Sequence, residues 1–173
     1  MFRNAIALDK NNIEAHQNAG TIAMSFKDYT SAANHFKTVV QLEPNNMKAH
    51  FQYGLALTGQ QKPKDALDEF EGVIKADRNF VEPLYYIGFI NQTYLKKLDK
   101  AIEYYEQFAN AKNADQKLRE KARENGKALK IQMEQAAHAK NALEEAHKKM
   151  KDEEEKKKRE EEAKKKAQED KKK

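Results

Sequence analysis

Glycines recur along this chain at an interval of 34 residues, and no other feature constrains the fold as strongly. They are Gly20, Gly54 and Gly88. Apolar residues keep the same interval: Ala32 with Ala66, Phe36 with Phe70, and Val39 with Val73. A fixed period of this length is typical of repeat proteins, in which each unit buries its apolar face against its neighbours. The sequence therefore predicts a stack of similar units.

Each unit has the apolar spacing of two amphipathic helices. In the first unit, one set recurs every three or four residues: Ala15, Ala19, Ile22, Ala23 and Phe26. A second set follows the same rule: Ala32, Ala33, Phe36, Val39, Val40 and Leu42. The recurring glycine is expected where the two helices meet, because a residue without a side chain lets the backbones approach closely. Pro44 is expected to end the second helix, since proline cannot continue it.

The repeat resembles the tetratricopeptide repeat family over roughly residues 1–115. The resemblance implies an all-α fold, an α-solenoid in which helix-turn-helix units form a right-handed superhelix. It divides the chain into the second helix of a truncated repeat at 1–12, three repeats at 13–46, 47–80 and 81–115, a capping or extended helix at 116–150, and a charged helix or frayed tail at 151–173. The third repeat carries a one-residue insertion, which is expected in the turn between its two helices.

The start of the chain matches only the second helix of a repeat. Phe2, Ala5 and Ile6 would then lack the helix that normally covers them. We therefore expect the chain to be a piece of a longer array, whose open end could self-associate.

The chain after Gln116 is expected to be one long helix. Its apolar residues continue at heptad-like spacing: Leu118, Ala122, Leu129, Met133, Ala136, Ala139, Leu143, Ala146 and Met150. The beginning, about 116–133, is expected to cap the last repeat. The rest of the stripe fits either a weak coiled-coil seam or a face that docks on a partner. From residue 151, runs of glutamate precede runs of lysine by four residues, which favours a solvated helix, with a frayed tail as the alternative.

Composition excludes several classes of protein. With no cysteine, the chain has no disulfide scaffold, thiolate metal site or cysteine nucleophile. The start lacks the apolar run of a signal peptide and no stretch is apolar enough to span a membrane, so a cytoplasmic protein is the default expectation and membrane binding is not expected. The net charge of +5 arises from 33 basic and 28 acidic residues, a mixture that disfavours nucleic-acid binding.

No motif for catalysis, metal or cofactor binding is present. The sequence contains no phosphate-binding glycine loop, dinucleotide fingerprint or HEXXH zinc motif. His16 and His50 occupy the same slot in neighbouring repeats, where we expect packing groups rather than metal ligands. The chain is therefore not expected to be an enzyme or to bind a cofactor.

The resemblance implies a concave groove lined by the first helix of each repeat. The positions carried over are Glu14, Gln17, Thr21, Met24, Lys48, Phe51, Leu55, Thr58, Glu82, Tyr85, Phe89 and Gln92. We expect the partner to bind at Gln17, Thr21, Met24, Lys48, Phe51, Leu55, Glu82, Tyr85, Tyr86 and Phe89. The aromatic members would be exposed anchors. Alternatively, they pack against adjacent helices or the chain's own long helix.

A subfamily of these repeats grips the acidic C-termini of chaperones with lysine, asparagine and arginine. The matching positions here are Gln17, Thr21, Gln52, Glu82 and Tyr86, and none fits. The expected partner is therefore a protein or peptide with an apolar or helical binding segment. Two other hypotheses stay open: attachment of the lysine-rich tail to an anionic surface of RNA or lipid, and pairing of the long helix with a second copy to make a dimeric spacer.

Overall fold

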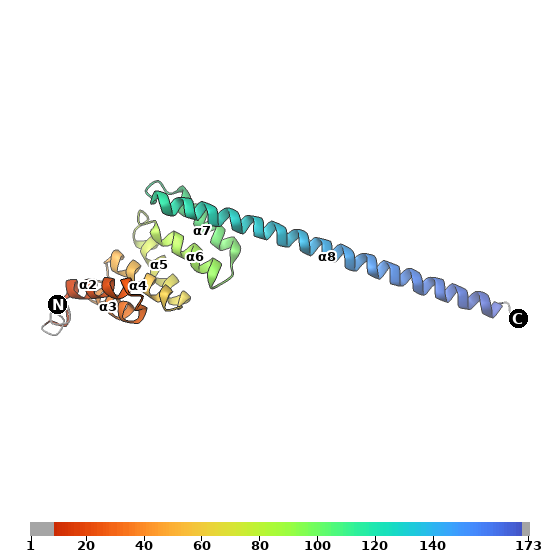
Figure 1. Cartoon of the computed structure of the whole chain (residues 1–173), viewed down its shortest axis with the longest axis horizontal. Helices are drawn as coiled ribbons and strands as arrows, with labels where there is room; N and C mark the ends of the chain where they lie inside the picture. The colour runs from red at the N-terminus through yellow and green to blue at the C-terminus, as the bar shows by residue number, and fades with distance from the viewer. Residues whose placement is uncertain (1–8, 171–173) are drawn as a thin grey trace. The chain divides into compact units, whose positions relative to one another are not determined.

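The computed structural model describes the backbone of residues 9–170, and side chains through Glu162 together with that of Lys164. Within that range the regular structure is helical throughout (Figure 1). The helices are α2 (Ile13–Ser25), α3 (Tyr29–Leu42), α4 (Met47–Gly59), α5 (Pro63–Ala76), α6 (Glu82–Thr93), α7 (Leu98–Asn110) and α8 (Gln116–Asp170). The predicted all-α, α-solenoid fold is confirmed. The expected half repeat, with Phe2, Ala5 and Ile6, lies outside the described residues.

The chain divides into two compact units, one ending at Leu129 and the other beginning at Lys130. The first unit holds α2–α7 and the start of α8. Its helices form three hairpins, α2 with α3, α4 with α5, and α6 with α7, and each hairpin contacts the next through α3 with α4 and α5 with α6 (Figure 1).

The recurring glycines lie at the seam of each hairpin, as the sequence predicts. A Cβ atom placed on Gly20 would lie 2.9 Å from the ring of Phe36, and one on Gly54 would lie 2.6 Å from the ring of Phe70. In the third hairpin the same arrangement joins Gly88 to Tyr105, at 2.9 Å. These distances are too short for a real Cβ atom, so each ring fills the space that the glycine leaves. This contact explains why the two residue types recur together.

Local signals in the sequence set the helix ends. Asn12 and Asn46, which are 34 residues apart, accept hydrogen bonds from the backbone N–H groups of Ala15 and Ala49 and so begin α2 and α4. α3 ends at Leu42, two residues before Pro44, which cannot continue a helix.

The turns within the hairpins share a left-handed residue. Lys27, Gln61 and Lys96 have φ values of 59°, 59° and 55°. After Lys27, the N–H of Asp28 donates to the carbonyl of Ala23, which completes a Schellman-type end for α2. Residues 94–97 join α6 to α7, whereas 26–28 and 60–62 join the earlier pairs, so the third turn is the longer one.

The start of α8 covers the last hairpin. Ala122 and Leu129 are buried in one cluster with Tyr105 and Phe108 of α7. The Arg119 guanidinium donates to three carbonyl oxygens of the α7–α8 connection, those of Ala111, Lys112 and Ala114. These contacts satisfy both apolar and polar groups at the end of the stack, as a capping helix must.

The second unit is the remainder of α8. Among its described side chains only Met133 is partly covered; the others are exposed, including the large apolar residues Ile131, Leu143 and Met150. Lys140 with Glu144, and Glu155 with Arg159, form ion pairs one turn apart. Of the two alternatives for the charged tail, the structure has the helix, which continues to Asp170.

Candidate partner-binding groove

A groove with a volume of about 550 Å³ opens within the first unit. Most of its lining is apolar or aromatic: Met24, Tyr29, Leu55, Tyr85, Tyr86, Phe89, Tyr94 and Leu118. The polar part of the lining is Thr58, Gly59, Gln61 and Lys121. The volume lies within the range of ordinary ligand pockets. We call this feature the aromatic groove.

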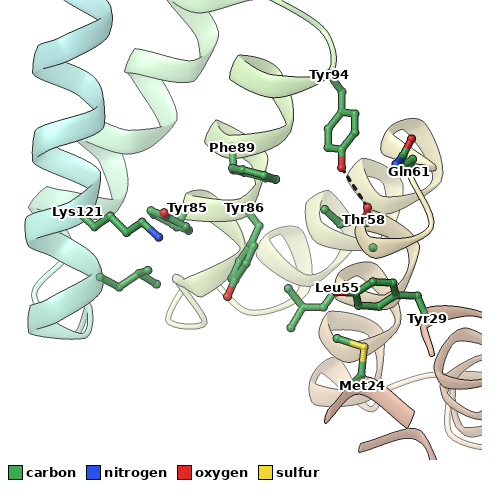
Figure 2. Close-up of a pocket in the computed structure, with 12 residues that line it drawn as sticks. Met24, Tyr29, Leu55, Thr58, Gln61, Tyr85, Tyr86, Phe89, Tyr94 and Lys121 are labelled. Carbon is green, nitrogen blue, oxygen red and sulfur yellow. Dashed lines mark hydrogen bonds between the residues drawn. The ribbon is translucent and has the colours of Figure 1, made fainter. Parts of the chain in front are cut away.

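One wall of the aromatic groove is the face of α6, whose helical spacing places Tyr85, Tyr86 and Phe89 together (Figure 2). The rings of Tyr85 and Tyr86 meet edge to face, with centroids 5.4 Å apart. Burial, then the neighbouring Tyr85 and Glu82, raise the pKa of Tyr86, so its phenol stays neutral at ordinary pH. This wall is a fixed apolar surface whose hydroxyl group can donate a hydrogen bond.

The opposite wall comes from the earlier hairpins and the turn after α6. Leu55 and Thr58 face the groove from α4, and the Tyr94 hydroxyl donates to the carbonyl oxygen of Thr58 at 3.3 Å (Figure 2). The rings of Phe89 and Tyr94 lie 6.2 Å apart in a T-shaped pair. The hydrogen bond therefore ties the rim of the third hairpin to the second and holds the groove's width.

The structure brings together half of the predicted site. Five predicted residues line the aromatic groove: Met24, Leu55, Tyr85, Tyr86 and Phe89. Gln17, Thr21 and Lys48 instead line a separate, more polar hollow of about 170 Å³ between α2 and α4. Glu82 lies in the first turn of α6, half-buried, and is part of neither lining.

The prediction of exposed anchors is wrong for two of the aromatic residues. Phe51 is 9% exposed, and its ring packs against Phe70, Phe80 and Tyr86. Tyr85 is 5% exposed, so it adds little accessible surface to the groove that it lines. The physical reason is that adjacent helices and the capping helix cover these rings, which is the alternative given with the prediction. Phe51 supports the groove from behind Tyr86 rather than lining it.

Sequence reasoning missed several lining residues outside the first helix of each repeat. Tyr29 begins α3, Gln61 and Tyr94 lie in turns, and Leu118 and Lys121 belong to α8. A signal existed for Leu118, which stands in the apolar stripe of the capping helix. Tyr94 follows Gln60 by 34 residues, and both side chains donate to a backbone carbonyl of the preceding hairpin.

Comparison with known proteins agrees with this architecture. The family model for the tetratricopeptide repeat matches residues 23–86. The matched residues include α3, α4, α5 and the beginning of α6. The comparison with curated proteins found no match.

Several solved tetratricopeptide repeat structures share the fold. The P58(IPK) TPR domain is similar with a TM-score of 0.67 and 19% identity, over 78% of this chain and 37% of that one. The Sgt2 TPR domain from Aspergillus fumigatus gives 0.63 and 16%, over 73% and 82%. MamA from Desulfovibrio magneticus RS-1, from residue 41 to its end, gives 0.55 and 22%, over 61% and 59%. This chain thus spans about three fifths of that MamA structure.

His16 and His50 occupy equivalent positions in the first two hairpins, and each hydrogen-bonds to the chain before its helix. His16 is buried, and its Nε2 donates to the carbonyl oxygen of Lys10 at 3.1 Å. Its Nδ1 therefore accepts from Nδ1 of His35, 3.0 Å away, when both rings are neutral. Burial, and then the proximity of His16, lower the pKa of His35, which favours this neutral pair.

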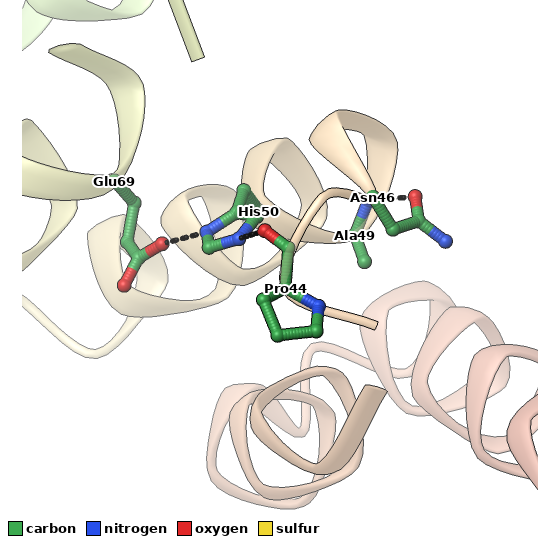
Figure 3. A network of polar contacts seen from close by, with 5 residues as sticks. All are labelled: Pro44, Asn46, Ala49, His50 and Glu69. Atoms are coloured by element: carbon green, nitrogen blue, oxygen red, sulfur yellow. Dashed lines mark hydrogen bonds and ion pairs between the residues drawn. The ribbon is translucent and has the colours of Figure 1, made fainter. Parts of the chain in front are cut away.

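In the second hairpin, His50 makes the same link to the chain before its helix. Its Nε2 donates to the carbonyl oxygen of Pro44 at 2.9 Å (Figure 3). Its Nδ1 lies 2.6 Å from a carboxylate oxygen of Glu69 on α5 (Figure 3). The two histidines thus contact different partners and do not share a ligand. Among the residues that the structure describes, no three metal-ligating side chains gather into a possible metal site.

No helix among the described residues combines the length and the apolar character of a membrane span.

Proposed function

We propose that this chain is a non-catalytic scaffold that binds a peptide or helix of a partner protein in the aromatic groove. Tetratricopeptide-like folds generally serve as protein–protein interaction scaffolds. The observation that carries the proposal is the groove itself: a large, mainly apolar hollow lined by the partly exposed Leu55, Tyr86 and Phe89. An apolar surface of this size is what a partner's apolar side chains would bury.

The rigidity of the groove supports this role. Tyr86 packs on Phe51 and Phe70, at centroid distances of 5.6 and 5.8 Å, so the α6 wall is held by the core of the second hairpin. The bond from Tyr94 to Thr58 holds the opposite rim. Because these side chains are ordered before the partner arrives, binding costs less conformational entropy.

The experiment uses peptides selected from a random library displayed on phage against the immobilised full chain. Their affinities for the wild type and for Phe89→Ala and Leu55→Ala are measured by fluorescence polarisation. Both side chains are partly exposed and line the groove. We expect each substitution to weaken binding by about 1–2 kcal/mol, the usual cost of truncating an interface anchor.

Phe26→Ala is the matched control. Phe26 is 80% exposed and is not part of the groove lining, so its loss should leave the affinity unchanged. Far-ultraviolet circular dichroism checks that each variant remains folded. Equal affinity of the selected peptides for all of these folded variants would refute the groove as the binding site.

A further inference from the structure

The aromatic groove carries a single charged side chain. Of the residues that line it, only Lys121 is ionic, and this side chain is exposed. Its ammonium nitrogen lies 6.0 Å from the centroid of the Tyr85 ring, and Figure 2 shows it reaching from α8 toward the α6 wall. Lys121 has no ion pair within the part of the chain that the structure describes. A cation at the edge of an apolar hollow is therefore left without a counter-charge.

The carboxylate of Glu82, near the α6 wall, does not neutralise Lys121. Glu82 is near enough to Tyr86 to help raise its pKa, yet it forms no ion pair with Lys121 and does not line the groove. Lys121 is exposed, so solvent screens its charge until a partner covers the groove. A partner's carboxylate placed there would meet an unpaired positive charge beside the apolar surface of Tyr86 and Leu118.

From this geometry we infer the chemistry of the ligand: a peptide segment in which an aspartate or glutamate stands beside large apolar side chains, with its carboxylate paired to Lys121. The inference rests on the proposed function and makes it more specific. The apolar side chains fill the hollow between Phe89, Leu55 and Tyr86, and the acidic residue sets the direction and register of the segment. Charge complementarity of this kind governs specificity more than total affinity.

The lysine that reads the carboxylate belongs to the capping helix rather than to the first helix of a repeat. The positions at which a carboxylate clamp would be expected hold Gln17, Thr21, Gln52, Glu82 and Tyr86. The groove lining therefore has one lysine that can bind a carboxylate, at its α8 edge. The partner's carboxylate does not need to be a free C-terminus. An internal acidic side chain serves equally well.

The test uses the full chain, the phage-selected peptides and two charge-reversed variants. Lys121→Glu reverses the charge inside the groove, and Lys127→Glu makes the same change in net charge at an exposed lysine of α8 outside the lining. We expect peptides selected on the wild type to be enriched in an acidic residue next to large apolar ones. Their affinity should fall about tenfold or more for Lys121→Glu and less than about twofold for Lys127→Glu.

A charge exchange makes the test specific. The acidic residue of one selected peptide is replaced by glutamine and by lysine. The lysine peptide should bind Lys121→Glu better than it binds the wild type, while the glutamine peptide should bind both about equally. A response that follows net charge alone would affect Lys121→Glu and Lys127→Glu to the same extent, and would overturn the assignment of Lys121.

The two proposals fail in different ways. If peptide binding is lost in Phe89→Ala but is the same in wild type and Lys121→Glu, the groove binds peptides and the inference about the carboxylate is wrong. If binding is unaffected by Phe89→Ala, the proposed function itself is wrong.

Discussion

The two units of this chain are both helical, but they are stabilised in different ways. In the first unit, each helix buries an apolar face, and fully buried rings such as Phe70 and Tyr105 fill the space left by glycines. In the second unit, from Lys130, nearly every described side chain is exposed, and the polar contacts seen are between residues one turn apart. The repeats therefore depend on tertiary packing, whereas the second unit depends on local helix propensity and charge order.

This difference implies that the groove depends on the packing of the first unit and not on the helix after Lys130. The aromatic groove is built entirely within the first unit, so its shape depends on buried seams. Substitutions in the buried seams should therefore change the free energy of unfolding strongly, and substitutions in the second unit should change it little.

The largest effect is expected from Phe70→Ala, compared with Leu143→Ala. Phe70 is fully buried against Gly54 and Phe51, whereas Leu143 is 58% exposed. Removing the buried ring should cost about 3–5 kcal/mol, and removing the exposed leucine should stay within about 0.5 kcal/mol. Urea unfolding followed by far-ultraviolet circular dichroism, which reports on both units, measures this; tyrosine fluorescence follows the first unit separately, because all seven tyrosines lie there. Similar losses for the two variants would contradict the comparison.

Smaller effects are expected at two glycines of the second hairpin, where substitution by alanine should change the free energy of unfolding in opposite directions. In Gly54→Ala, the new methyl group would lie 2.6 Å from the Phe70 ring, and this overpacking should cost about 1–3 kcal/mol. Around Gly72, which is exposed in α5, no atom lies within 4 Å of an added Cβ, so Gly72→Ala should stabilise the protein by about 1 kcal/mol. Thermal unfolding of both variants gives the signs. Destabilisation by Gly72→Ala would contradict the comparison, because no atom stands in the way of the added methyl group there.

The turn of the first hairpin offers a gain of about 0.5–1 kcal/mol. Lys27 has a φ of 59°, a conformation that costs side-chain-bearing residues roughly 1 kcal/mol. Glycine adopts this conformation without strain, so Lys27→Gly should raise the free energy of unfolding. The increase is reduced in part because glycine also raises the conformational entropy of the unfolded chain. Lys27→Ala retains the strain and is the control. If the two variants unfold at the same urea concentration, the left-handed turn carries no strain.

The period of 34 residues was sufficient to predict the helices, their pairing and the glycine seams, because each depends on local spacing. The positions of Met24, Leu55, Tyr85, Tyr86 and Phe89 in the groove lining were predicted from the family resemblance. The exposure of Phe51 was mispredicted, since burial depends on how one hairpin packs on the next. Periodicity within a helix cannot show that Phe80, beyond the helix end, closes over that ring.

The groove's remaining residues depend on long-range packing. Lys121 comes within reach of Tyr85 only because the capping helix folds back along α7, which Arg119, Ala122 and Leu129 bring about. A repeat motif that assigns the binding face to the first helix of each unit omits the cap. The apolar stripe beyond Leu129 correctly indicated a helix. Leu143 and Met150 of this stripe are exposed, so a weak coiled-coil seam and a docking face for a partner both stay predictions.

The smallest expected effect concerns the order of charges in the second unit. Glu155 precedes Arg159 by four residues, whereas Lys140 precedes Glu144, and the first order agrees better with the helix dipole. Glu155→Gln should therefore weaken the local helix by about 0.3–0.5 kcal/mol and Glu144→Gln by less. Hydrogen exchange of the flanking amides at low salt measures the difference, and high salt should remove it through screening. Equal protection in both variants at low salt would mean that side-chain propensity alone, without charge order, holds this unit helical.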